Sequence, residues 1–181
     1  QQETCVANCD SERREVYRFY SGRRLDHVYH YDSELPDNLP LNPRRYNREP
    51  RSGIQVFYFQ KENLANTTPV YLHYDSSNFN SYLSSSSSGA IALLGYIWSN
   101  ATDPANHSNG SVLNPGESMI PLYHYRATGD PRGTDDFYTI DPANESNLQI
   151  GVAGVPDSTN PLEQAYTCLL YTSPSPRDSR K

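Results

Sequence analysis

Three short segments of the chain repeat one pattern of alternating apolar or aromatic and polar positions. They read VYRFY at 16–20, VYLHY at 70–74 and LYHY at 122–125, and their first tyrosines lie 54 and 52 residues apart. Alternation with a period of two predicts β-strands with one face toward a core. We expect the first tyrosine of each segment, and the residue two positions further on, to share that buried face.

A second strand follows each of these segments and predicts a β-hairpin. DHVYHYD at 26–32 matches DDFYTID at 135–141 almost position for position, and NFNSYLS at 78–84 is a weaker middle copy. The residues between the two strands are turn formers, among them Gly22 and Gly129. Each copy is therefore expected to open with a hairpin.

A third, more apolar segment closes each copy, at 53–59, at 93–98 and, as a poorer match, at 162–167. The connections that precede these segments are rich in Pro or Ser and do not support long helices. The sequence therefore predicts an all-β protein with few short helices at most. Three pseudo-repeats of about 50 residues are expected to form one compact, trefoil-like or barrel-like β domain.

The domain boundaries follow from these repeats. Residues 1–15 are expected to form an N-terminal arm and residues 16–167 the three-repeat domain, with repeats at about 16–69, 70–121 and 122–167. Residues 168–181 form a tail whose sequence resembles the translated adapter read-through of environmental sequencing, so we interpret it as foreign to the biological protein. Because the chain opens on Gln1 without an apolar leader, we interpret it as a mature form.

Tyrosine dominates the aromatic content. The chain has 181 residues, of which 15 are tyrosine, while its hydrophobic content is 35% and its mean hydropathy is −0.78. A tyrosine ring can be buried while its hydroxyl finds a polar partner, so these residues can build a core. The tyrosines predicted to form the repeat core are Tyr17, Tyr29, Tyr71, Tyr82, Tyr123 and Tyr138.

Charge and hydropathy exclude two classes of partner. The net charge of −6 argues against a nucleic-acid partner. No apolar run approaches the roughly 20 residues that span a bilayer. One basic cluster, Arg44, Arg45, Arg48 and Arg51, is interpreted as a solvated loop between prolines.

Glycosylation sequons and cysteines indicate the compartment. Five Asn-x-Ser/Thr acceptors, all in polar stretches, predict N-glycosylation and a secreted, extracellular protein. They are Asn66, Asn100, Asn106, Asn109 and Asn144. Of the three cysteines, Cys5 and Cys9 are predicted to form a disulfide, although either of them with Cys168 stays open as an alternative.

The candidate catalytic and metal-binding residues all have a simpler structural explanation. His27 and His30 lie on opposite faces of a strand, which favours a hydrogen-bonded structural histidine over a shared metal. The acids at 26, 32 and 34, and at 135, 136 and 141, are explained best by strand-end and turn hydrogen bonds rather than by glycosidase chemistry. The segment 130–136 resembles a calcium loop only loosely. We therefore expect no catalytic residue, no metal and no cofactor.

The quoted strands resemble a known kind of repeat. The run VYRFYSGRRLDHVYHYDSE, followed by FYF and PVYLHY, is similar to a Tyr-rich repeat domain family of unknown function that is found in secreted proteins. Only the first copy keeps the Asp26-His27 pair, since the third has Asp135-Asp136. More remotely, the chain resembles glycosylated extracellular fibril protomers from fresh water, which combine a compact β domain with an extended N-terminal arm.

Two function classes are compatible with these features. The first is a secreted structural protein that self-assembles with other copies of itself into a fibril or matrix, through strand addition by its N-terminal arm. The motivating feature is the weak third closing strand, which would leave an open sheet edge. The alternative is a carbohydrate-binding, lectin-like module, in which exposed tyrosines stack on sugars. Neither is an enzyme.

Overall fold

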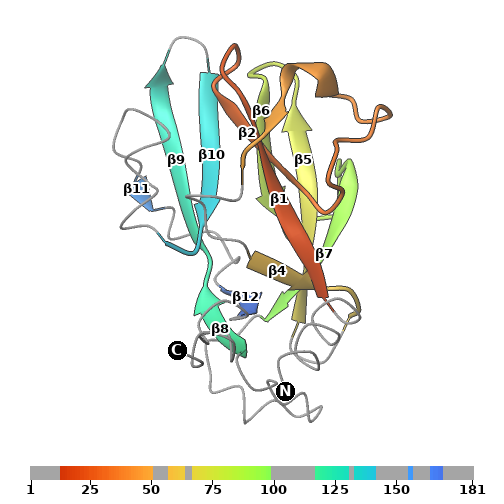
Figure 1. The fold of residues 1–181 in the computed structure, drawn as a ribbon. Helices are drawn as coiled ribbons and strands as arrows, with labels where there is room; N and C mark the ends of the chain where they lie inside the picture. The colour runs from red at the N-terminus through yellow and green to blue at the C-terminus, as the bar shows by residue number, and fades with distance from the viewer. Residues whose placement is uncertain are drawn as a thin grey trace, which may run out of the picture.

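The fold is all-β, as expected from the alternating pattern (Figure 1). The computed structural model describes residues 13–50, 57–63, 67–98, 117–130, 133–141, 155–156 and 164–168. Its strands are β1 (Arg13–Ser21), β2 (Asp26–His30), β3 (Asn47–Arg48), β4 (Phe57–Gln60), β5 (Thr67–Asp75), β6 (Asn80–Ser84), β7 (Ala92–Trp98), β8 (Glu117–Pro121), β9 (Tyr123–Asp130), β10 (Gly133–Thr139), β11 (Val155–Pro156) and β12 (Gln164–Cys168). Among the described residues, the helical content is one 3₁₀ turn, η1 (Pro43–Arg45).

Three antiparallel hairpins form the upper part of the molecule in Figure 1: β1–β2, β5–β6 and β9–β10. Their first strands share one order of burial. Starting from Val16, Val70 and Leu122, successive side chains are buried, more open, buried, buried and more open again. A strand buried on one face would alternate instead. Both faces of each first strand are therefore covered near its middle.

This double burial corrects part of the predicted tyrosine core. Tyr29 and Tyr138 are buried, but Tyr123 is 40% exposed, so its core assignment is wrong. Tyr17, Tyr71 and Tyr82 are half-buried. The core-facing positions one residue after the three first tyrosines are Arg18, Leu72 and His124.

The middle hairpin does not place Tyr82 where the predicted core required it. Leu72 pairs with Leu83 across β5 and β6, just as Arg18 pairs with Tyr29 in the first hairpin. His124 pairs with Tyr138 in the third hairpin. Leu83, and not Tyr82, therefore occupies the position of the buried tyrosines.

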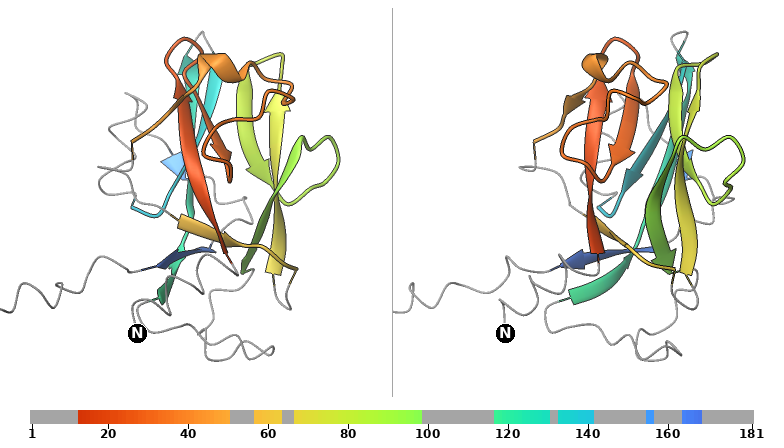
Figure 2. Two further views of the ribbon diagram at one scale, coloured as in Figure 1. Left: turned by 45° about the vertical axis from the view of Figure 1, so that its right-hand side comes forward. Right: turned by 90° about the vertical axis from the view of Figure 1, so that its right-hand side faces the viewer.

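The main sheet is open, which corrects the barrel-like expectation. Its strands run in the order β2-β1-β4-β7-β5-β6, and β2 and β6 at its ends are not joined by backbone pairing. β9, β10 and β11 form a separate three-stranded sheet. The second strands β2, β6 and β10 nevertheless contact one another, as the views in Figure 2 indicate. Hydrogen bonds from side chains join these three strands, where a closed barrel would have backbone hydrogen bonds.

A lower group of strands completes the molecule. β4 pairs with β1 on one side and with β12 and β7 on the other, and β12 pairs in turn with β8. β12 lies where the poorly matching third closing strand was expected, so that strand is formed. β1 begins at Arg13, and Arg13–Glu15 pair with β4, so residues 13–15 of the predicted arm belong to the folded sheet.

Gly95 lets β7 pass close to β4. Its φ of +151° favours glycine, and a Cβ at this position would lie 2.7 Å from the backbone oxygen of Gln60. We expect Gly95→Ala to lower the free energy of unfolding by at least about 2 kcal/mol, because it combines backbone strain with a clash. Chemical denaturation measures this change.

Gly22→Ala is the matched control for Gly95→Ala. Gly22 lies in the β1–β2 turn, where the nearest atom to an added Cβ is 3.9 Å away. Since an alanine fits there and restricts the unfolded chain, the change should be neutral or stabilising by less than about 1 kcal/mol. Equal losses for the two variants would contradict the explanation for Gly95.

Candidate functional site

The second strands of the three hairpins meet in a buried polar cluster. Each strand carries an acid or its amide at or near its start, Asp26, Asn80 or Asp135, and a polar residue follows it. These three residues are 0%, 7% and 5% exposed, respectively. Buried polar groups need hydrogen-bond partners, and here the partners come from the neighbouring hairpins.

Hydrogen bonds join the three hairpins in a cycle. Asp26 in the first hairpin accepts hydrogen bonds from the backbone N–H and the hydroxyl of Ser81 in the second, both at 2.9 Å. Asn80 in the second donates to Asp136 in the third, at 2.7 Å. Asp135 in the third accepts from the backbone N–H of His27 in the first at 2.9 Å, and from its ring Nδ1 at 2.7 Å. Each hairpin therefore holds the next one.

Two tyrosines link the hairpins in the opposite direction. The Tyr29 hydroxyl accepts from the N–H of Tyr138 at 2.7 Å and donates to its carbonyl at 3.0 Å. The Tyr138 hydroxyl in turn accepts from the N–H of Leu83 at 2.9 Å and donates to its carbonyl at 3.3 Å. Leu83 has no hydroxyl with which to complete this second cycle. The tyrosines close strand edges that would otherwise be unpaired.

Ion pairs flank the cycle. Arg18 pairs with Glu49, whose carboxylate also lies 4.0 Å from Nε2 of His27. On the other side, Asp136 accepts from His124 at 2.5 Å and from Arg126 at 3.0 Å. The buried acids thus face histidine, arginine or amide groups.

Burial and these contacts shift several pKa values. Burial raises the pKa of Asp26 to about 7, although its bonds from Ser81 and Tyr46 act to lower it. For Asp136, burial acts in the same upward direction, but the bonds from His124 and Asn80 and the charges of His124 and Arg126 bring the pKa below its usual value. Burial raises the pKa of Tyr29 and Tyr138, which keeps both hydroxyls protonated.

The contacts of this buried polar cluster indicate a structural role, which is to join the three hairpins. Asp26, Asp135 and Asp136 are buried and each is bonded to another hairpin, and among the described residues no three His, Cys, Asp or Glu side chains are arranged to hold a metal. The sequence prediction of a hydrogen-bonded His27 agrees with its bond to Asp135. Strand-end and turn bonds were expected for the acids of the first and third copies, but in the structure such turn bonds are made by Asp75, which accepts from Ser77 and Asn78. The expectation is wrong for Asp26, Asp135 and Asp136, whose partners lie on other hairpins.

The remaining predicted acids lie apart from this cluster. The carboxylate of Asp32 is half exposed and lies 3.7 Å from His30, whose pKa is lowered by burial. Glu34 is exposed. Asp141 is half-buried at the end of the third hairpin, where its N–H donates to Thr139. The structure therefore does not gather either predicted set of acids around one cleft.

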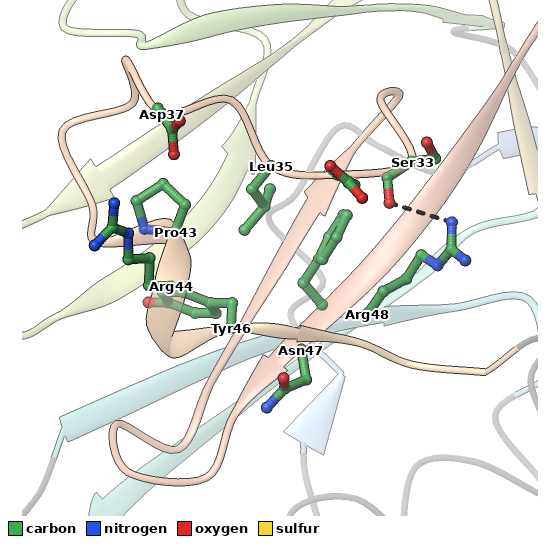
Figure 3. Close-up of a pocket in the computed structure, with 10 residues that line it drawn as sticks. Ser33, Leu35, Asp37, Pro43, Arg44, Tyr46, Asn47 and Arg48 are labelled. Carbon is green, nitrogen blue, oxygen red and sulfur yellow. Dashed lines mark hydrogen bonds between the residues drawn. The ribbon is translucent and has the colours of Figure 1, made fainter.

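A pocket lies on the segment that connects β2 to β4 (Figure 3). Its volume is about 570 Å³, and it is lined by Phe19, by residues 33–35, by Asp37 and by residues 43–44 and 46–48. The arginine cluster of this segment was interpreted from the sequence as a solvated loop, and Arg44 and Arg48 are exposed while Arg45 is half-buried; Arg51 lies outside the described residues. The segment also contains η1, and its Leu41 and Tyr46 are buried against the core.

The remaining predicted sites lie outside the described residues. They are the sequons Asn66, Asn100, Asn106, Asn109 and Asn144, and the cysteines Cys5 and Cys9. Of Cys168, the structure describes only the backbone, which pairs with Glu117. In the described part of the chain there is no helix long and apolar enough to cross a bilayer.

The fold and its centre define an all-β module of hairpins joined by buried side chains. The chain belongs to the family described as Domain of unknown function (DUF5648), whose model matches residues 1–100. This agrees with the expectation of a domain family of unknown function. No curated protein and no solved structure matches the chain.

Proposed function

We propose that the protein is a secreted, N-glycosylated, non-catalytic structural protein that assembles with copies of itself into an extracellular fibril or matrix. The observation that supports this proposal best is an open strand edge. β8 pairs with β12 along all five of its residues, while no second described strand pairs with its other side. Unpaired strand edges are templates for strand addition.

The position of this edge suits a head-to-tail contact. Tyr58 of β4 pairs with Glu15 of β1 on one side and with Tyr166 of β12 on the other. The order across this part of the sheet is therefore β1-β4-β12-β8. Residues 1–12 join the sheet at β1, whereas the open edge lies at β8, three strand spacings or about 14 Å away. An arm that leaves one side and an edge on the other side favour open-ended growth.

Residues 1–12 would reach far enough for such a contact. If extended, they would span up to about 40 Å, about three times the separation of β1 and β8. The other long edges are less suitable, because side chains close the second strands of the hairpins. Ser81 and Leu83 of β6, for example, donate their backbone N–H groups to Asp26 and Tyr138. This favours β8 as the acceptor of a neighbour's arm.

Deletion and substitution within residues 1–12 test this proposal. We expect the full chain to form filaments in negative-stain electron micrographs, and the chain without residues 1–12 to stay as single particles. Val6→Pro should act like the deletion, because proline cannot donate to a strand ladder. Val6→Thr is the matched control, since it keeps the N–H and a β-branched side chain. Filaments that persist in the deleted or Val6→Pro chain would exclude this mode of assembly.

A further inference from the structure

The pocket between residues 33 and 48 belongs to a segment that is much longer than its counterpart in the second hairpin. β2 and β4 are separated by residues 31–56, whereas β6 and β7 are separated only by residues 85–91. The extra residues form η1 and the pocket walls. Segments added to a rigid scaffold in this way are where binding sites are commonly carried.

The pocket walls are held from several directions. The Tyr46 hydroxyl donates to Asp26 at 2.8 Å, and the Glu49 N–H donates to the Arg18 carbonyl at 2.9 Å. Across the pocket, the Arg48 guanidinium donates to the Ser33 carbonyl at 3.2 Å, which ties one wall to the other. Walls fixed in this way lose little conformational freedom when a ligand binds.

The polar side chains at the rim of the pocket end in planar groups that are free to bond a ligand. Glu34, Asp37, Arg44 and Asn47 are exposed, and within the described residues their side chains have no hydrogen-bond or ion-pair partner. A carboxylate, an amide and a guanidinium each present two polar atoms side by side, a geometry that matches neighbouring hydroxyl groups. Two acids face two arginines, counting Arg48, so the rim carries no net charge.

The apolar part of the pocket is aliphatic. Figure 3 shows Leu35 and Pro43 between the side chains of Asp37 and Arg44 at one end and that of Arg48 at the other. Phe19 and Tyr46 also line the pocket but are only 3% and 8% exposed, so their rings do not offer an open stacking face. The contact surface is therefore a small aliphatic patch surrounded by hydrogen-bonding groups.

We propose that this pocket binds a neutral sugar residue of the hexose class, at the end of a glycan. A pyranose ring combines aliphatic C–H faces with a rim of neighbouring hydroxyls, and the pocket provides both complements. Its volume of about 570 Å³ lies within the range of about 300–1,000 Å³ of small-molecule sites. This inference does not depend on assembly, since the pocket is distant in the sheet from β8.

Saturation-transfer NMR on the full chain tests the pocket. The probes are the methyl glycosides of mannose, galactose and glucose, together with N-acetylglucosamine, with glucuronic acid and glucosamine as charged comparators. We expect one neutral probe to bind with a dissociation constant of about 1 mM or below, and more tightly than either charged probe. No saturation transfer from any neutral probe at about ten times that concentration, or a preference for a charged one, would overturn the proposal.

Two substitutions locate the binding. Glu34→Ala and Asn47→Ala should each weaken it at least tenfold, while Glu62→Ala, an exposed carboxylate outside the pocket, should leave it unchanged. Because all three side chains are exposed, their thermal unfolding should match that of the parent chain, which separates lost contacts from lost folding. Unchanged binding in both pocket variants would place the sugar elsewhere and refute this site.

Discussion

Tyr138→Phe should lower the free energy of unfolding by about 3 kcal/mol. The Tyr138 hydroxyl satisfies both the N–H and the carbonyl of Leu83 on the neighbouring hairpin. Phenylalanine fills the same space but leaves two buried backbone groups without partners, each at a cost of about 1–3 kcal/mol. Chemical denaturation of the two chains at one pH measures the difference.

Tyr29→Phe should have a similar effect, because it leaves the N–H and the carbonyl of Tyr138 unpaired. Tyr123→Phe is the matched control, since Tyr123 is 40% exposed on the first strand of the third hairpin. Its loss of a hydroxyl should change stability by less than about 0.5 kcal/mol. If all three variants lost the same stability, the tyrosine links would not be what joins the hairpins.

The second large effect concerns Asp26 and pH. Burial raises its pKa from 3.8 in the unfolded chain to about 7 in the folded one. Between these values the folded protein holds a proton that the unfolded chain has lost, so this carboxyl stabilises the fold at low pH. The contribution falls as pH rises from about 4 to about 7, by about 2–4 kcal/mol, and does not return above pH 7.

Asp26→Asn should remove this dependence. An amide at this position can accept from the Ser81 N–H and donate to the hydroxyl of Ser81 or Tyr46, and Asn80 already occupies the equivalent position in β6. We expect the variant to be more stable than the parent chain by about 2–4 kcal/mol at pH 8 and similar to it at pH 4. Denaturation curves of both proteins across this range provide the measurement.

Comparing the Asp26→Asn variant with the parent chain separates the effect of Asp26 from that of groups that destabilise the fold as pH falls. Burial lowers the pKa of His30, so its protonation destabilises the fold as pH falls below about 6.5. The lowered pKa of Asp136 makes its contribution disappear as pH falls below about 4. Both are present in the two proteins and cancel in the difference. An Asp26→Asn chain that is less stable than its parent at pH 8 would contradict the raised pKa.

The alternating pattern predicted where the strands lie better than which way they face. The three hairpins, and closing strands β4, β7 and β12, were found within or overlapping the expected ranges. The prediction that Tyr123 faces the core was wrong. It assumed that only one face of the strand is buried, whereas Leu122, His124 and Tyr125 on both faces are buried. In the middle copy, Leu83 lies where Tyr82 was expected, and only contacts between hairpins reveal this placement.

The candidate site was harder to predict for a related reason. The sequence does contain a signal, since Asp26, Asn80 and Asp135 lie at or near the start of the second strands of the three hairpins. Strand periodicity alone, however, could not tell that their partners lie 55, 56 and 108 residues away on other hairpins. No sequence pattern indicated the pocket. It is formed by an irregular segment in which Ser33 and Arg48 come together only after folding.

The edge at β8 was not predicted either. From the sequence we expected an open edge where the third closing strand is weak, but β12 fills that place and pairs with β8. Among the described strands, the side of β8 away from β12 has no paired strand, and no repeat pattern indicated β8. We therefore keep strand addition by the N-terminal arm as the proposed mode of assembly, with β8 as the proposed acceptor strand.

Amide hydrogen exchange, read by mass spectrometry, tests the account most directly. It compares the assembled full chain with the chain that lacks residues 1–12. If a neighbour's arm adds to β8, the amides of residues 117–120 gain protection on assembly, while β2, β6 and β10, whose edges side chains already close, exchange equally in both. Protection gained in the second strands of the hairpins, with none in β8, would contradict the proposed mode of assembly.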